Sequence, residues 1–93
     1  MVRHIVMWKF REGAEKEADA FLSGLRALSG VIPQLRKCEV GKNIGANNYD
    51  AVLVSEFDSM ADLAAYQVDP RHVAVVALCK PICADRVAVD YEF

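Results

Sequence analysis

Two histidines and one tyrosine are the residues whose types and spacing could carry acid–base chemistry in this chain. His4 lies in an apolar stretch near the N-terminus, and His72 follows an Asp-Pro pair by two residues. A histidine in the first turn of a helix is biased towards the neutral imidazole, because the helix dipole disfavours a cation there. A neutral imidazole is what a general base requires at neutral pH. Tyr66 stands six residues upstream of His72, so its hydroxyl is predicted to reach the same cavity and to hold a carbonyl or an enolate.

A structural interpretation of the same three residues stays open. His72 could hydrogen-bond the Asp69 carboxylate or the backbone, as a residue at a helix start often does. His4 could be a satisfied core residue, and Tyr66 could serve packing alone. The spacing does not separate these interpretations from catalysis.

Charge and hydropathy exclude several partners. The 93 residues carry 13 acidic and 11 basic side chains, for a net charge of −2, and no basic stripe indicates nucleic acid or an anionic membrane. No apolar run approaches the roughly 20 residues that span a bilayer. No leader segment is visible at the N-terminus, so we expect a cytoplasmic protein without a membrane or nucleic-acid partner.

The sequence contains no motif that would bind a metal or a cofactor. Cys38, Cys79 and Cys83 are odd in number, Pro81 separates the last two, and neither histidine is close to them. Free thiols of this kind are usually buried and structural. The loop 41–48 lacks the lysine-serine end of a phosphate loop and precedes a strand. We therefore predict no cofactor and no metal.

The elements that position these side chains follow one another without an internal repeat, as a single domain over residues 1–93. Four segments have the alternation of strands: 2–10, 35–42, 49–57 and 86–93. Helical spacing runs from 14 to 28, and Asp58 or Ser59 marks the start of a second helix. Asp69-Pro70 marks a further helix start, so the apolar run 73–79 is interpreted as a buried helix.

The order βαββαβ predicts a ferredoxin-like α+β fold. Right-handed crossovers place the helices on one face of the four-stranded sheet. Ile5 and Met7, with Val52 and Val54, then leave apolar side chains on the opposite face. A second copy would cover that face, which predicts a homodimeric α+β barrel. A monomer with an exposed apolar patch is the alternative.

Five segments also resemble a known family. They are the opening strand 2–10 with its histidine, Ile32-Pro33 with 40–43, the run 49–59, the Tyr-x-x-x-Pro-x-His segment within 65–73, and the closing 89–91. Together they span essentially the whole chain and resemble the stress-responsive α/β-barrel domain (Dabb) family. The resemblance implies a ferredoxin-like barrel dimer, and many members have a link to stress but no known activity.

One family member is a plant polyketide cyclase that makes olivetolic acid by a cofactor-free, aldol-type ring closure. The resemblance aligns its site with His4, Tyr66 and His72. This chain departs from it at Ala51, where the cyclase has a histidine, and at Trp8, where the cyclase has a smaller residue. Where the cyclase has two aromatic residues on its first helix, this chain has Phe21 and Leu22. Olivetolic acid chemistry is therefore not expected, whereas a smaller carbonyl substrate stays open.

Three functional hypotheses follow. The first is a small-molecule pocket between sheet and helices, walled by Val6, Trp8, Phe21 and Leu53. In it His72 acts as base, Tyr66 as hydrogen-bond donor and His4 as the orienting group. The second is a non-catalytic stress or assembly protein with a filled interior. The third, and weakest, is a haem-binding or monooxygenase-like α+β barrel.

Overall fold

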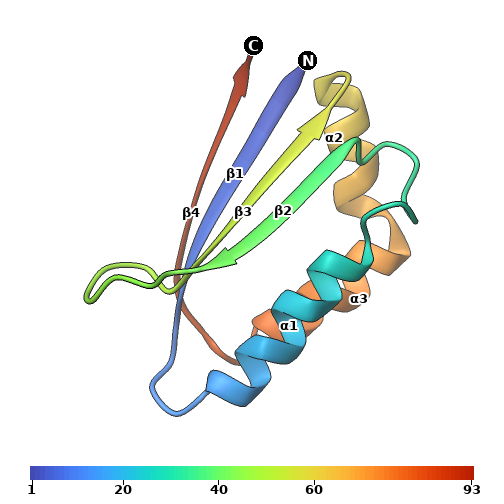
Figure 1. Ribbon diagram of the computed structural model, residues 1–93. Coiled ribbons are helices and arrows are strands. Elements are labelled where there is room, and N and C mark those ends of the chain that lie inside the picture. The colour runs from blue at the N-terminus through green and yellow to red at the C-terminus, as the bar shows by residue number, and fades with distance from the viewer.

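A computed structural model describes residues 1–93, and the chain folds in the predicted order with the second helical region split in two (Figure 1). The elements are β1 (Val2–Phe10), α1 (Glu15–Ala27), β2 (Lys37–Lys42), β3 (Ala51–Phe57), α2 (Met60–Val68), α3 (Pro70–Cys79) and β4 (Cys83–Glu92). The strands form one antiparallel sheet in the order β2-β3-β1-β4. This arrangement confirms the predicted ferredoxin-like α+β fold. Compared with the prediction, β2 and β3 begin two residues later and β4 begins three residues earlier.

The helix starts form as their sequence signals predict. Ser59 Oγ accepts a hydrogen bond from the backbone N–H of Asp62 at 3.1 Å, which caps α2. Asp69 Oδ1 accepts from the backbone N–H of Arg71 at 2.9 Å and caps α3, with Pro70 at the first helical position. None of the three helices is both long and apolar enough to cross a membrane.

The run 73–79 is helical as predicted, but the prediction that this helix is buried was wrong. Val73 is 53% exposed, Leu78 is 47% exposed, and Cys79 is the one buried residue of α3. The helix packs against α1 along one side, where Gly24 permits a close approach: a Cβ there would lie 3.1 Å from Val75 Cγ1. A second side of α3, with His72, Val76 and Cys79, faces the sheet across a cavity. The other sides of α3 face outwards, so its apolar composition alone overstated its burial.

The core lies between the helices and one face of the sheet. Alternation along β1 directs His4, Val6 and Trp8 into it, and all three are buried. Trp8 meets Phe21 of α1 edge to face, with ring centroids 5.2 Å apart. The helix side of the sheet is therefore where the predicted site residues gather.

The opposite face of the sheet has no helix over it (Figure 1). Its apolar side chains come from three strands: Ile5, Met7, Val52, Val54, Val87, Val89 and Tyr91. Met7 is 39% exposed and Val89 is 61% exposed. A contiguous exposed apolar surface of this kind is typical of an interaction site.

Candidate functional site

A cavity of about 350 Å³ lies between the helix side of the sheet and helices α1 and α3. Its walls are largely apolar and include six of the seven side chains predicted for the site: His4, Val6, Trp8, Phe21, Leu53 and His72. The Trp8 indole forms part of the wall and leaves the space open. A volume above about 300 Å³ lies in the range of small-molecule sites.

His4 is held by a partner that sequence reasoning missed. The register of β1 and β4 places Asp90 directly opposite His4, and Asp90 Oδ1 forms a short hydrogen bond with His4 Nδ1. Because a carboxylate only accepts, Nδ1 carries the proton, and Nε2 has no protein partner. His4 is 4% exposed, so this pairing satisfies an otherwise isolated polar group in the core.

His72 occupies the first turn of α3 and lines the cavity from the opposite side. Its Nδ1 lies 3.2 Å from the Gln67 carbonyl oxygen, and it therefore donates to that oxygen and leaves Nε2 free. Burial lowers the pKa of His72 below 6.5, and the nearby His4 and Arg86 lower it further. The imidazole is thus neutral at pH 7, and burial is the largest cause of its lowered pKa.

Tyr66 does not line the cavity, although its sequence position suggested a shared space with His72. Its ring lies beside those of Phe57 and His72, with centroid distances of 5.1 Å and 4.3 Å. The residue is fully buried, and its hydroxyl has no hydrogen-bond partner. Burial also raises the pKa of the Tyr66 phenol, which stays protonated. In this arrangement the ring packs against His72, and the hydroxyl is not part of the cavity wall.

Four further residues border the cavity at the junction of α3 and β4: Cys79, Lys80, Cys83 and Arg86. No disulfide joins the cysteines. Burial raises the pKa of Cys79 to about 12, so its thiol stays protonated and is a poor nucleophile at neutral pH. These positions carried no motif, and only the assembled sheet reveals that β4 borders the site.

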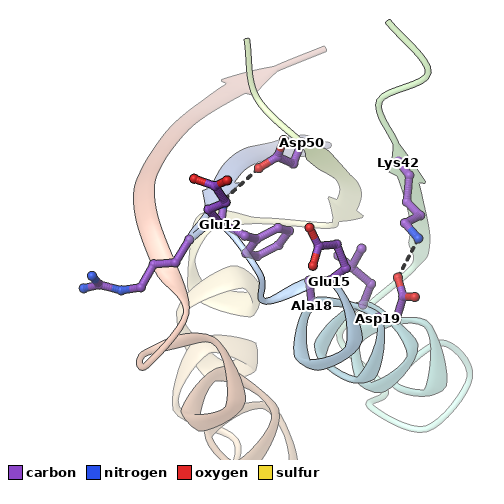
Figure 2. A pocket seen from close by; sticks show the side chains of 9 residues that line it. Glu12, Glu15, Ala18, Asp19, Lys42 and Asp50 are labelled. Carbon is purple, nitrogen blue, oxygen red and sulfur yellow. Dashed lines mark hydrogen bonds and ion pairs between the residues drawn. The ribbon is translucent and has the colours of Figure 1, made fainter. Parts of the chain in front are cut away.

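A second hollow of about 250 Å³ lies between the end of β1 and the start of α1 (Figure 2). Figure 2 shows acidic side chains around it, two of which are already engaged. Asp50 Oδ2 accepts from the backbone N–H of Phe10 at 2.8 Å, and Asp19 Oδ1 lies 2.5 Å from Lys42 Nζ. The first contact joins the start of β3 to the end of β1, and the second joins β2 to α1, which gives the hollow a structural explanation. No group of three or more potential metal ligands occurs in the chain.

An antiparallel sheet with helices on one face and a cavity beneath them defines the class of protein as a ferredoxin-like α+β domain. Residues 2–93 match the Stress responsive A/B Barrel Domain (Dabb) family, and the chain belongs to this family. It is 37% identical to an uncharacterised protein of Streptomyces coelicolor over the whole of both chains. The family resemblance drawn from the sequence is thereby confirmed.

Several solved structures also resemble the chain. A dimeric ferredoxin-like protein of unknown function from Bacteroides fragilis is 35% identical, with a TM-score of 0.90 over 99% of this chain and 95% of the other. A second dimeric protein of unknown function, from Thermobifida fusca, is 32% identical, with a TM-score of 0.88 over 99% and 90%. A hydroxynitrile lyase from Passiflora edulis is 23% identical, with a TM-score of 0.84 over 97% and 90%, and shares the fold alone.

Proposed function

We propose that the cavity binds a small, largely apolar carbonyl compound and that His72 removes a proton from the carbon next to the carbonyl. The observation that carries this proposal is that His72 lines a cavity with largely apolar walls and has a neutral imidazole with a free Nε2. A base of this kind has the correct protonation state at pH 7.

The proposed step moves one proton and one electron pair. His72 Nε2 takes the proton, and the C–H electron pair becomes the enolate, which then recovers a proton or forms a new bond to carbon. Across the cavity, Asp90 holds the ring of His4 through Nδ1–H, which leaves the Nε2 lone pair of His4 as an acceptor that can orient a hydroxyl or another donor group of the ligand. Tyr66 is a positioning residue here, since its ring packs against His72 and its hydroxyl does not line the cavity.

The proposed working unit is a homodimer. The open face of the sheet exposes apolar side chains such as Met7 and Val89, and two solved relatives above 30% identity are dimeric. Two such faces packed together would give the α+β barrel predicted from the sequence. Each cavity lies on the helix side of its own sheet, away from that interface.

The reaction is tested by proton exchange, which needs no knowledge of the natural substrate. Phenylacetaldehyde and 4-phenyl-2-butanone are incubated with the protein in D2O, and NMR follows the loss of the C–H signals beside the carbonyl. His72→Asn should slow the exchange by about 10²-fold or more, the usual contribution of a general base. Val73→Asn is the matched control, because its side chain is 53% exposed and lies outside the cavity.

Other outcomes would support the rival hypotheses. Ligand binding without exchange, or exchange unchanged in His72→Asn, would reject the proposed base and leave a binding protein. Failure to bind any apolar compound would favour a structural barrel dimer. An absorption band after addition of haemin would favour the haem-binding hypothesis.

A further inference from the structure

The border of the 350 Å³ cavity carries two cationic side chains and no carboxylate. Lys80 follows the last residue of α3, and Arg86 lies on β4. The chain as a whole has the opposite balance, with 13 acidic and 11 basic residues. Asp90, further along β4, is engaged by His4. The cavity is therefore a local positive site in a weakly acidic protein.

Arg86 makes no ion pair, in contrast to three other arginines of the chain. Arg3, Arg36 and Arg71 each lie within 3.5 Å of a carboxylate oxygen. The hydrogen bond that Arg86 makes in this region runs from its backbone N–H to Asp85 Oδ1, at 2.9 Å, and leaves the guanidinium free.

The position of Arg86 directs its charge towards the cavity. In the antiparallel register Arg86 lies opposite Trp8, so the two side chains emerge on the helix side of the sheet. The charge of Arg86 acts on groups inside the cavity: it adds to the lowering of the His72 pKa and opposes the rise that burial causes in the pKa of Cys79. Lys80 has a second role, since a cation is favourable at the C-terminus of α3. Arg86 has no such structural explanation.

We propose that the ligand of this cavity is an amphipathic anion: an apolar body against Trp8 and Phe21, and a carboxylate or similar head bound by Arg86 with help from Lys80. This inference rests on the proposed function, because it specifies the class of compound that the same cavity takes. A planar guanidinium binds a carboxylate through two parallel hydrogen bonds, which gives orientation as well as affinity. The anionic head would stay at the border and place the body beside His72.

A matched pair of probes tests the charge requirement. Trp8 is the single tryptophan of the chain and lines the cavity, so its fluorescence reports occupancy. It is titrated with 4-phenylbutanoate and with 4-phenylbutanamide, which differ in charge and hardly in size, and with octanoate and octanamide. We expect each acid to bind about tenfold more tightly than its amide, which corresponds to about 1.4 kcal/mol.

Three variants assign the effect to the border. Arg86→Met should remove most of the preference for the acid and leave amide binding nearly unchanged, because methionine keeps the apolar stem. Lys80→Met should have a smaller effect in the same direction. Lys16→Met is the matched control, since it makes the same change in net charge at an exposed position of α1 outside the cavity.

The outcomes separate this inference from the proposed function. Equal affinity for acid and amide, or an equal loss for both in Arg86→Met, would overturn the anionic ligand while leaving a ligand-binding cavity. No change of Trp8 fluorescence with any of the four probes would overturn both. If Lys16→Met weakened acid binding as much as Arg86→Met does, the preference for the acid would come from the net charge of the protein, and the proposed anion site would be rejected.

Discussion

Tyr66→Phe should make the protein more stable, although tyrosine and phenylalanine occupy nearly the same space. The side chain is fully buried, and its hydroxyl is the one buried side-chain polar atom without a hydrogen-bond partner. The unfolded chain hydrates this hydroxyl, whereas the folded chain leaves it unpaired. Removing it therefore removes a cost that only the folded state bears.

The expected size of the effect combines two opposing terms. A buried unsatisfied polar group costs about 1–3 kcal/mol. Deleting one oxygen leaves a void of roughly 12 Å³, which costs about 0.3 kcal/mol. The net gain in the free energy of unfolding is then about 0.7–2.7 kcal/mol. Each kcal/mol raises the melting temperature of a domain of this size by about 4–8 °C.

The assay is thermal and urea unfolding followed by circular dichroism, at one fixed protein concentration because dimerisation shifts the midpoint. Tyr49→Phe is the control: its hydroxyl donates to Asp85 Oδ2 at 2.5 Å, so its removal should bring no gain. A Tyr66→Phe variant that melts lower than the parent would show that the hydroxyl is satisfied in the folded protein, and the reasoning would be refuted.

The same variant also tests the role of Tyr66 in the site. The ring that packs against His72 is preserved in phenylalanine, so the rate of deuterium exchange should stay within about threefold of the parent. A fall of about tenfold or more would instead support the direct hydrogen-bond donor that the sequence predicted. Stability and activity are thus expected to respond differently to the loss of one oxygen.

Three further predictions concern pH, assembly and capping. The urea midpoint should fall as the pH drops below 6.5, because the unfolded chain protonates His72 more readily than the folded chain. His72→Asn should flatten this part of the pH profile, and an unchanged slope in that variant would contradict the prediction. Val89→Lys should turn a dimer into a monomer by sedimentation, whereas Val73→Lys, on the outward side of α3, should leave the mass unchanged. Asp69→Ala should lower the free energy of unfolding by about 1 kcal/mol through loss of the α3 cap, and a loss no larger than that of Asp58→Ala, which removes an exposed ion pair, would show that the cap contributes little.

The sequence by itself determined the order of the elements and the faces of the strands. Alternation along β1 separates His4, Val6 and Trp8 from Ile5 and Met7, and the structure buries the first set. Side chains that are local in sequence set the helix starts, as Ser59 and Asp69 do. These features depend on neighbours a few residues apart, which is why pattern and capping rules reach them.

Tertiary structure alone decided which further residues complete the site. His4 meets Asp90 across 86 positions of sequence, and Arg86 borders the cavity because β4 pairs with β1 in one particular register. Tyr66 packs against His72 because the chain turns at Asp69 and brings the end of α2 beside the first turn of α3. Contacts of this kind arise from long-range strand pairing and from the packing of helices on the sheet, which no spacing along the chain encodes. The sequence thus supplied the two histidines and the apolar wall, whereas the fold supplied the partner of one histidine, the support of the other and the cation at the border.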